Sequence, residues 1–205
     1  MADFEIENKT LIKYVGNAKN VTVPDGITAI GKAAFRDCSS LTSVTLPQSV
    51  KTICQDAFRN CRALTDLILP SGIEEISYGA FENVPYFRVP ASGMGYFEKD
   101  CHEYLWEKAV LGFLHAYYSG KTSEEENGEW RKYTSRRTVK LFRLLPDEPL
   151  LYRYLTDRRI LSPKRVIPLL EETENPECRA ILLDYGKRGK KRSSAEDIID
   201  KKFKL

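Results

Sequence analysis

The chain has 205 residues, of which 42% are hydrophobic and 30% are charged, which suits one or two globular domains. No run of apolar residues approaches the ~18 that a transmembrane helix needs, and the polar, acidic N-terminus does not resemble a secretory signal. The net charge of +3 is too small to indicate a nucleic-acid partner by itself. We therefore expect a cytoplasmic protein, or an extracellular one if a signal has been removed.

Residues 3–19 are predicted to form a β-hairpin. Apolar residues flank the polar sequence Glu7-Asn8-Lys9, and asparagine suits a tight turn. The flanking residues are Phe4, Ile6, Leu11, Ile12, Tyr14 and Val15. A hairpin at this place would close the open end of a repeat array, which is a role that terminal units must fill.

From Val21 to Val89 the sequence repeats itself with a period of 23 residues. Two positions show the repeat most clearly, one held by proline and one by phenylalanine: Pro24, Pro47 and Pro70, then Phe35, Phe58 and Phe81. A fixed period of this length is typical of a solenoid, in which each unit buries its faces on its neighbours. We count about three such repeats.

Each repeat is predicted to contain a short strand that ends at its proline, which has no N–H for the ladder. In Leu41-x-x-Val44-x-Leu46-Pro47, the two apolar residues before proline face one way and the residue between them faces the other. A second apolar pair follows, Val50 and Ile53 in this repeat, and then a turn or a single helical turn carrying Ala-Phe-x-x-Cys. Phe87-x-Val89-Pro90 repeats the strand ending and predicts a fourth strand in a shortened last unit.

The phrase Leu-Pro-x-x-Val-x-x-Ile-x-x-x-Ala-Phe-x-x-Cys-x-x-Leu, which runs from Leu46 to Leu64, resembles the BspA-like class of bacterial leucine-rich repeats. The resemblance covers about residues 20–90, and the opening from Phe4 to Tyr14 is also similar to the start of many such arrays. It implies a parallel-sheet solenoid that recognises proteins or surfaces.

Helical patterning begins after the flexible sequence Ala91–Gly95. A broad apolar stripe predicts a buried helix over about 97–118. Two capping-box patterns, at Thr122 and Ser123, predict a second helix that reaches about Leu145, with a start nearer Glu129 because Gly128 weakens the first turn.

Three further helices are predicted to open with proline in the first turn, at Pro149, Pro163 and Pro176. Pro168 should kink the second of these or delay its start. A last helix is predicted from Ser193 through Phe203. Short helices joined by tight loops indicate a helical repeat or a bundle, and Ala180–Gly186 loosely resembles the end of an ankyrin repeat.

The fold class is therefore predicted to be α+β. A leucine-rich-repeat solenoid with a parallel sheet and an N-terminal hairpin would occupy residues 1–90. An all-α helical-repeat or bundle domain with a basic C-terminal tail would occupy residues 96–205.

No catalytic constellation and no cofactor motif is found. Cys101-His102-Glu103 contains metal-ligand types, but adjacent residues of a helix point about 100° apart, so we predict no metal site there. The odd count of cysteines favours free thiols; they are Cys38, Cys54, Cys61, Cys101 and Cys178. Cys38 and Cys61 should stack, which leaves a disulfide conceivable, although Val84 in the same slot favours small apolar core residues.

We predict a protein that binds or scaffolds, not an enzyme, with another protein as its partner. The candidate contact residues are the outward strand positions Asn20, Thr22, Ser43, Thr45, Asp66 and Ile68, where Ile68 is apolar among polar neighbours. The alternative is an anionic partner such as nucleic acid, bound by basic residues of the helical half. Those residues are Lys132, Arg136, Lys140, Arg143, Lys187, Arg188, Lys190, Lys191 and Arg192. An enzyme with an unrecognised site between the two domains is the third hypothesis.

Overall fold

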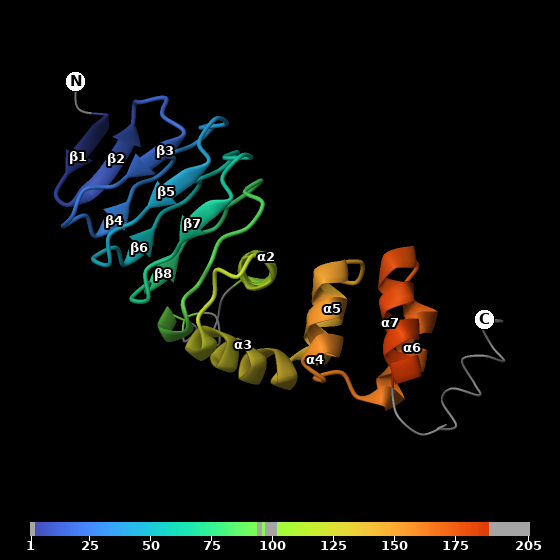
Figure 1. The fold of residues 1–205 in the computed structure, drawn as a ribbon. Helices are drawn as coiled ribbons and strands as arrows, with labels where there is room; N and C mark the ends of the chain where they lie inside the picture. Colours follow the sequence, from blue (N-terminus) through green and yellow to red (C-terminus); the bar gives the residue numbers. More distant parts are fainter. Residues whose placement is uncertain (1–2, 94–95, 97–101, 189–205) are drawn as a thin grey trace. The chain divides into compact units, whose positions relative to one another are not determined.

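The structure is a computed structural model that describes residues 3–93, 96 and 102–188 (Figure 1). The chain divides into two compact units, Met1–Glu126 and Asn127–Leu205. The first unit holds the described strands and helix α2 (Glu103–Tyr118). Helix α3 (Glu124–Arg136) begins in the first unit and continues into the second, which also holds α4 to α7. Among the described residues, no helix has both the length and the apolar character that crossing a membrane requires.

The predicted N-terminal hairpin is confirmed. Strands β1 (Phe4–Glu7) and β2 (Thr10–Tyr14) pair antiparallel, with Glu7 opposite Thr10. Asn8 and Lys9 connect them with φ of 47° and 63°, and this left-handed conformation matches a two-residue turn to the twist of the strands. Strand β2 also pairs in parallel with β4 (Ala29–Ile30). The hairpin therefore covers the end of the first repeat.

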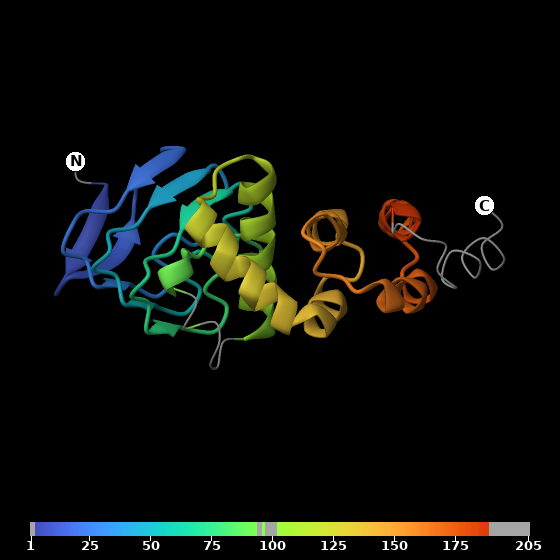
Figure 2. The same cartoon turned by 60° about the horizontal axis from the view of Figure 1, so that its bottom comes forward.

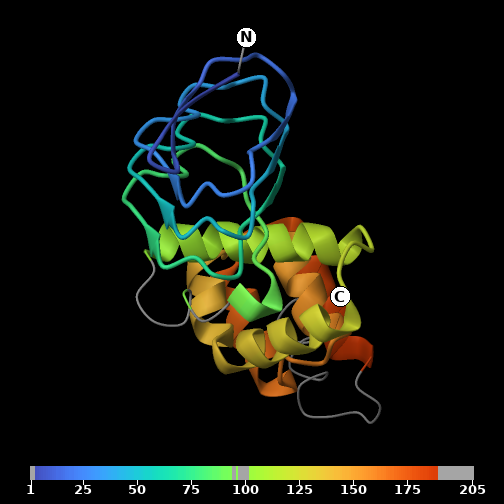
Figure 3. The same cartoon turned by 90° about the vertical axis from the view of Figure 1, so that its left-hand side faces the viewer.

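Each repeat contributes two strands, where the sequence predicted one. The predicted strands form a three-stranded parallel sheet of β3 (Asn20–Thr22), β5 (Ser43–Thr45) and β7 (Asp66–Ile68). The second apolar pair of each repeat ends a further strand, which gives a five-stranded sheet in the order β1-β2-β4-β6-β8. Strands β6 (Thr52–Ile53) and β8 (Glu75–Ile76) continue that sheet in parallel. Figure 3 looks toward the N-terminal end of these stacked coils.

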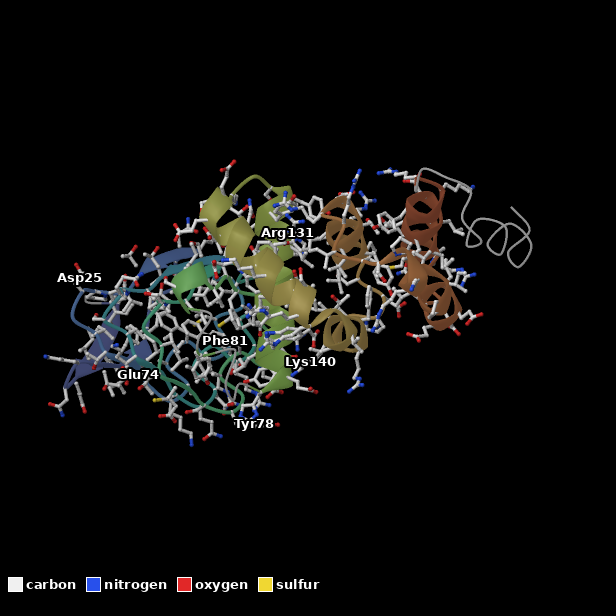
Figure 4. All side chains as sticks on the ribbon, turned by 90° about the horizontal axis from the view of Figure 1, so that it is seen from below. Asp25, Glu74, Tyr78, Phe81, Arg131 and Lys140 are labelled. Atoms are coloured by element: carbon white, nitrogen blue, oxygen red, sulfur yellow. The ribbon has the colours of Figure 1, made fainter. Side chains whose placement is uncertain are left out.

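The segment Ala-Phe-x-x-Cys, which has Val84 in place of cysteine in the third repeat, is a turn in every repeat rather than a helical turn. The backbone of each repeat enters the left-handed region twice, just before this segment at Ala33, Asp56 and Gly79 and within it at Asp37, Asn60 and Asn83. The predicted phenylalanine column is confirmed, because the Phe35 and Phe58 rings stack at 5.0 Å and the Phe58 and Phe81 rings at 5.4 Å. In Figure 4 Phe81 lies among the side chains inside the repeats, whereas Tyr78 lies at their margin.

The array ends at a single bridge between Ile68 and Arg88, so the predicted fourth strand is reduced to one paired residue. A short 3-10 turn, η1 (Ala91–Gly93), follows. Helix α2 then lies across the last coil (Figures 2 and 3). Gly112 makes this possible, since a Cβ there would lie 1.9 Å from the backbone oxygen of Phe87. The helix predicted over 97–118 is described from Glu103 onward, and residues 97–101 lie outside the described residues.

The helix predicted to reach Leu145 is broken at Arg137, whose φ of −121° and ψ of 18° separate α3 from α4 (Thr138–Leu144). Hydroxyl groups on both sides of the break donate to carbonyls of the preceding turn: Thr134 Oγ1 to Trp130 O at 2.8 Å and Thr138 Oγ1 to Thr134 O at 3.1 Å. Such bonds compete with the backbone ladder and bend helices. Helix α3 begins at Glu124 rather than near Glu129.

The three proline-initiated helices are confirmed as α5 (Pro149–Asp157), the 3-10 turn η2 (Pro163–Arg165) that leads into α6 (Val166–Glu172), and α7 (Pro176–Arg188). The Glu148 carboxylate caps α5 by accepting from Leu150 N at 3.1 Å. Pro168 lies in the first turn of α6, which starts late, as predicted. Helices α5 and α7 pack side by side. The helix predicted over 193–203 lies outside the described residues.

Candidate functional site

The six predicted contact residues lie on one face of the three-stranded sheet, which we call the β3-β5-β7 face. The register places them in two columns that run across the strands, Asn20–Ser43–Asp66 and Thr22–Thr45–Ile68. Ser43 is half-buried and the other five are exposed. The alternate residues Val21, Val44 and Leu67 are buried in the core. The geometry brings the six residues together, and their role in binding stays a prediction.

Side-chain hydrogen bonds link neighbouring strands on this face. Ser43 Oγ donates to the Asp66 carboxylate at 3.3 Å. Thr42 Oγ1, one residue before β5, lies 3.1 Å from Asn20 Oδ1 and donates to Lys19 O at 3.0 Å. Parallel strands are about 4.8 Å apart, so short polar side chains at the same repeat position reach each other. The face is therefore a regular and internally braced polar surface.

Ile68 interrupts this polarity, because 42% of its surface is exposed. Its bridge partner Arg88 continues the same column beyond β7. The Arg88 guanidinium donates to Lys121 O at 2.9 Å and pairs with the Glu126 carboxylate at 3.3 Å. Sequence reasoning did not select Arg88, although it occupies the outward position of the predicted strand ending Phe87-x-Val89. Ile68 therefore lies in the column between Thr45 and an arginine that is held in place by its own hydrogen bond and ion pair.

A second surface feature, which the sequence reasoning missed, follows the turns of the repeats. Asn60 Nδ2 donates to Asp37 Oδ1 at 2.6 Å, and Asn83 Nδ2 donates to Asn60 Oδ1 at 2.7 Å. These three residues adopt positive φ, which asparagine and aspartate accept more readily than most residues do. Their 23-residue spacing was the available signal, and we interpret the ladder as structural.

Charged groups beside this ladder also join successive repeats. Buried Asp56 lies 3.7 Å from Arg36 and 3.6 Å from Arg59, and Arg59 pairs with Glu82 at 3.2 Å. Because these charges are paired with each other, the turn surface presents a balanced network rather than a field of one sign.

The basic residues of the alternative hypothesis do not form one stripe. Lys132 lies on α3 and pairs with Glu129 at 2.7 Å, and Arg136 ends α3. Lys140 and Arg143 lie on α4, beyond the break at Arg137, so the helical spacing on which the prediction relied is interrupted. Lys187 and Arg188 end α7, where Arg188 pairs with Asp184. Lys190, Lys191 and Arg192 lie outside the described residues.

The histidine and cysteine positions give no metal centre within the described part of the chain, where no cluster of three or more potential ligands occurs. Cys101 lies outside that part. His102 lies against aromatic rings, 6.1 Å from both Tyr78 and Tyr104. The four described cysteines are free thiols, and Cys61 donates to Phe35 O at 3.0 Å.

A comparison with protein families identifies the repeats. Residues 5–99 match the BspA type leucine rich repeat region. The match contains six copies of the family model, whereas the sequence period gave about three repeats of 23 residues. The helices after residue 99 lie beyond the match, so their loose likeness to ankyrin repeats stays a prediction.

A solved structure also resembles the chain. It is the crystal structure of a leucine rich repeat protein from T. pallidum, with 20% sequence identity over 43% of this chain and 68% of that chain, and a TM-score of 0.24. The comparison with curated proteins found no match.

Proposed function

We propose that this chain is a non-enzymatic module that binds another protein through the β3-β5-β7 face of a short leucine-rich-repeat solenoid, with the helical half as a further contact surface. The proposal rests on the match of residues 5–99 to leucine-rich repeats, a repeat type used mainly for protein interaction. It commits to one face because that face carries an exposed apolar residue in a braced polar frame.

Ile68 is the observation that carries the choice of face. Its side chain is 42% exposed. Burying this apolar surface against a partner would stabilise the complex by about 25 cal/mol for each Å² removed from water. Arg88 lies next to it in the column, and arginine is enriched among the residues that dominate binding energy. Thr22 and Thr45 line the rest of the column with methyl and hydroxyl groups, which suit a polar rim.

The double variant Thr45→Arg/Ile68→Arg tests the face. It places two long cations on neighbouring strands without touching the buried Val44 and Leu67. A matched control is Thr52→Arg/Glu75→Arg on β6 and β8, which are neighbouring strands of the other sheet. Affinity purification from native cells with quantitative mass spectrometry should show partners that bind the wild type and the control but not the test variant. Partners that the test variant retains at wild-type levels would exclude this face.

The anionic alternative has its own readout, since binding through several phosphate contacts weakens steeply with salt. A titration of generic DNA and RNA from low to high salt separates the two functions. Partner capture that is insensitive to nuclease and depends on Ile68 supports the protein-binding proposal. A cytoplasmic location remains part of the proposal, and fractionation of the native cell tests it.

A further inference from the structure

Two cysteines occupy equivalent positions in successive repeats. Cys38 and Cys61 follow directly after Asp37 and Asn60, whose side chains touch at 2.6 Å. The backbones of the two turns are also joined, by a hydrogen bond from Asp37 N to Arg59 O at 2.9 Å. The rings of Phe35 and Phe58, three residues earlier, are 5.0 Å apart. The two turns are therefore stacked at about the 4.8 Å spacing of paired chains, and this spacing falls in the range of Cα separations, about 4.4–6.8 Å, that a disulfide bridges.

The two thiols differ in their surroundings. Cys38 is half-buried at the surface, whereas Cys61 is fully buried. The S–H of Cys61 donates to Phe35 O at 3.0 Å, and the Cys61 side chain is also close enough to Cys38 for a hydrogen bond between the two sulfurs. That hydrogen bond favours the thiolate, so the pKa of Cys38 is lowered although burial and Asp37 oppose the shift. The same bond, together with burial, raises the pKa of the donor Cys61.

We propose that Cys38 and Cys61 form a reversible dithiol that reacts with hydroperoxides, with Cys38 as the nucleophile and Cys61 as the resolving thiol. Their equivalent positions in two stacked, hydrogen-bonded turns and the exposure of only one of them support these roles. The assignment goes beyond protein binding and does not depend on it.

The reaction has two steps. The Cys38 thiolate attacks one oxygen of the hydroperoxide, the O–O bond breaks, and the leaving alkoxide or hydroxide takes a proton, which leaves a sulfenic acid on Cys38. The sulfur of Cys61 then attacks the Cys38 sulfur, an S–S bond forms, the S–O bond breaks, and the hydroxide leaves as water with the proton of Cys61. The two thiols supply two electrons, which reduce the hydroperoxide, and an added dithiol reverses the bond by exchange.

The equivalent position in the third repeat and the places of Cys54 and Cys178 confine the pair to the first two repeats. The third repeat has Val84 in this slot, so the column contains no further thiol. Cys54 belongs to another column, in which hydrogen-bonded strands place it between Gly31 and Ser77. Cys178 lies in the second compact unit. A disulfide would therefore join the first two coils and close a loop of one repeat.

The test treats the full chain with hydrogen peroxide at a dose that oxidises added free cysteine completely. Remaining thiols are alkylated after denaturation and located by peptide mass spectrometry. We expect a peptide pair joined through Cys38 and Cys61, an unchanged circular dichroism spectrum, and a Tm raised by about 10 °C, because the bond restricts the unfolded chain. Dithiothreitol should restore both thiols and the original Tm.

Three variants make the roles separable. In Cys61→Val, which copies Val84, Cys38 should stop at the sulfenic acid and react with dimedone. In Cys38→Ser, Cys61 should remain a thiol. Cys54→Ser, which copies Ser77, is the matched control and should form the bond like the wild type. Recovery of Cys38 and Cys61 as alkylated thiols from the wild type, or a bond from Cys38 to any other cysteine, would overturn the proposal.

Discussion

The contact between α2 and the last repeat leads to a prediction about Gly112. A Cβ at this position would lie 1.9 Å from Phe87 O and 2.5 Å from Phe87 C. Both are backbone atoms of the last coil, so neither can move aside as a side chain tip could. Real Cβ contacts are essentially never shorter than 3.0 Å, so Gly112→Ala must move α2 away from the repeat by about 1 Å.

The sign of the effect makes this substitution informative. In an exposed helix, replacing glycine by alanine stabilises by about 1 kcal/mol. At Gly112 the displaced helix would loosen the packing of Trp106, Val110 and Phe113, which are buried. Overpacking of this kind costs about 1–3 kcal/mol and occasionally more. Because the clash is with backbone atoms, we take the upper end of this range, about 3 kcal/mol; after the helix-propensity gain of about 1 kcal/mol, Gly112→Ala should lower the free energy of unfolding by about 2 kcal/mol.

Gly128 in α3 is the matched control, because nothing lies within 4 Å of a Cβ built there. Gly128→Ala should be neutral or stabilise by up to about 1 kcal/mol. Urea unfolding of the full chain, followed by circular dichroism, measures both variants, and separate transitions are fitted if the two compact units unfold independently. A Gly112→Ala protein as stable as the wild type, or more stable, would refute the close packing of α2 on the last coil.

Three further predictions concern stability. Asn60→Ala should lower the free energy of unfolding in urea by about 2 kcal/mol, because it removes the side-chain ladder and places alanine in a left-handed backbone conformation. Asn60→Gly should lower it by less, since glycine accepts that conformation, and an equal loss for both variants would exclude a contribution from backbone strain. Arg88→Ala should cost about 1–3 kcal/mol, because it leaves Glu126 without the arginine partner it has in this half-buried pair; a loss below 0.5 kcal/mol, in the range of ordinary surface substitutions, would contradict this. Burial raises the pKa of Tyr104 and Tyr152 to about 12. Each tyrosine's contribution to stability is therefore present below pH ~10 and lost as pH rises toward 12, and tyrosine absorbance that titrates entirely near pH 10 in the folded protein would contradict this.

Much of the first unit follows from sequence because its repeat constrains it. Once Phe35, Phe58 and Phe81 are aligned, the strand register, the phenylalanine column and the outward positions are determined together. The hairpin turn at Asn8 was predictable for the same local reason, since few residues accept its backbone conformation. The second strand of each repeat was missed because β4, β6 and β8 are two residues long, which is too short for an alternating pattern.

Other features depend on contacts that a sequence pattern does not contain. The break at Arg137 follows from threonine hydroxyl groups on both sides of it that donate to backbone carbonyls four residues earlier. Arg88 became a candidate contact residue only when its bridge to Ile68 placed it in the column. The predicted boundary at residues 90–96 marks the change from strands to helices. As a boundary between independent domains it stays a prediction. Helix α2, which follows this boundary, packs on the last coil and belongs to the same compact unit as the repeats.

The affinity of Ile68→Arg for a partner purified on the wild-type chain is the most direct test of protein binding through the β3-β5-β7 face. Titration by calorimetry or surface plasmon resonance should give a Kd at least about 30-fold weaker than that of the wild type, as expected for loss of a central contact worth about 2 kcal/mol. Glu75→Arg on the other sheet should keep the wild-type Kd. Equal affinity of Ile68→Arg and the wild type would contradict the proposed face.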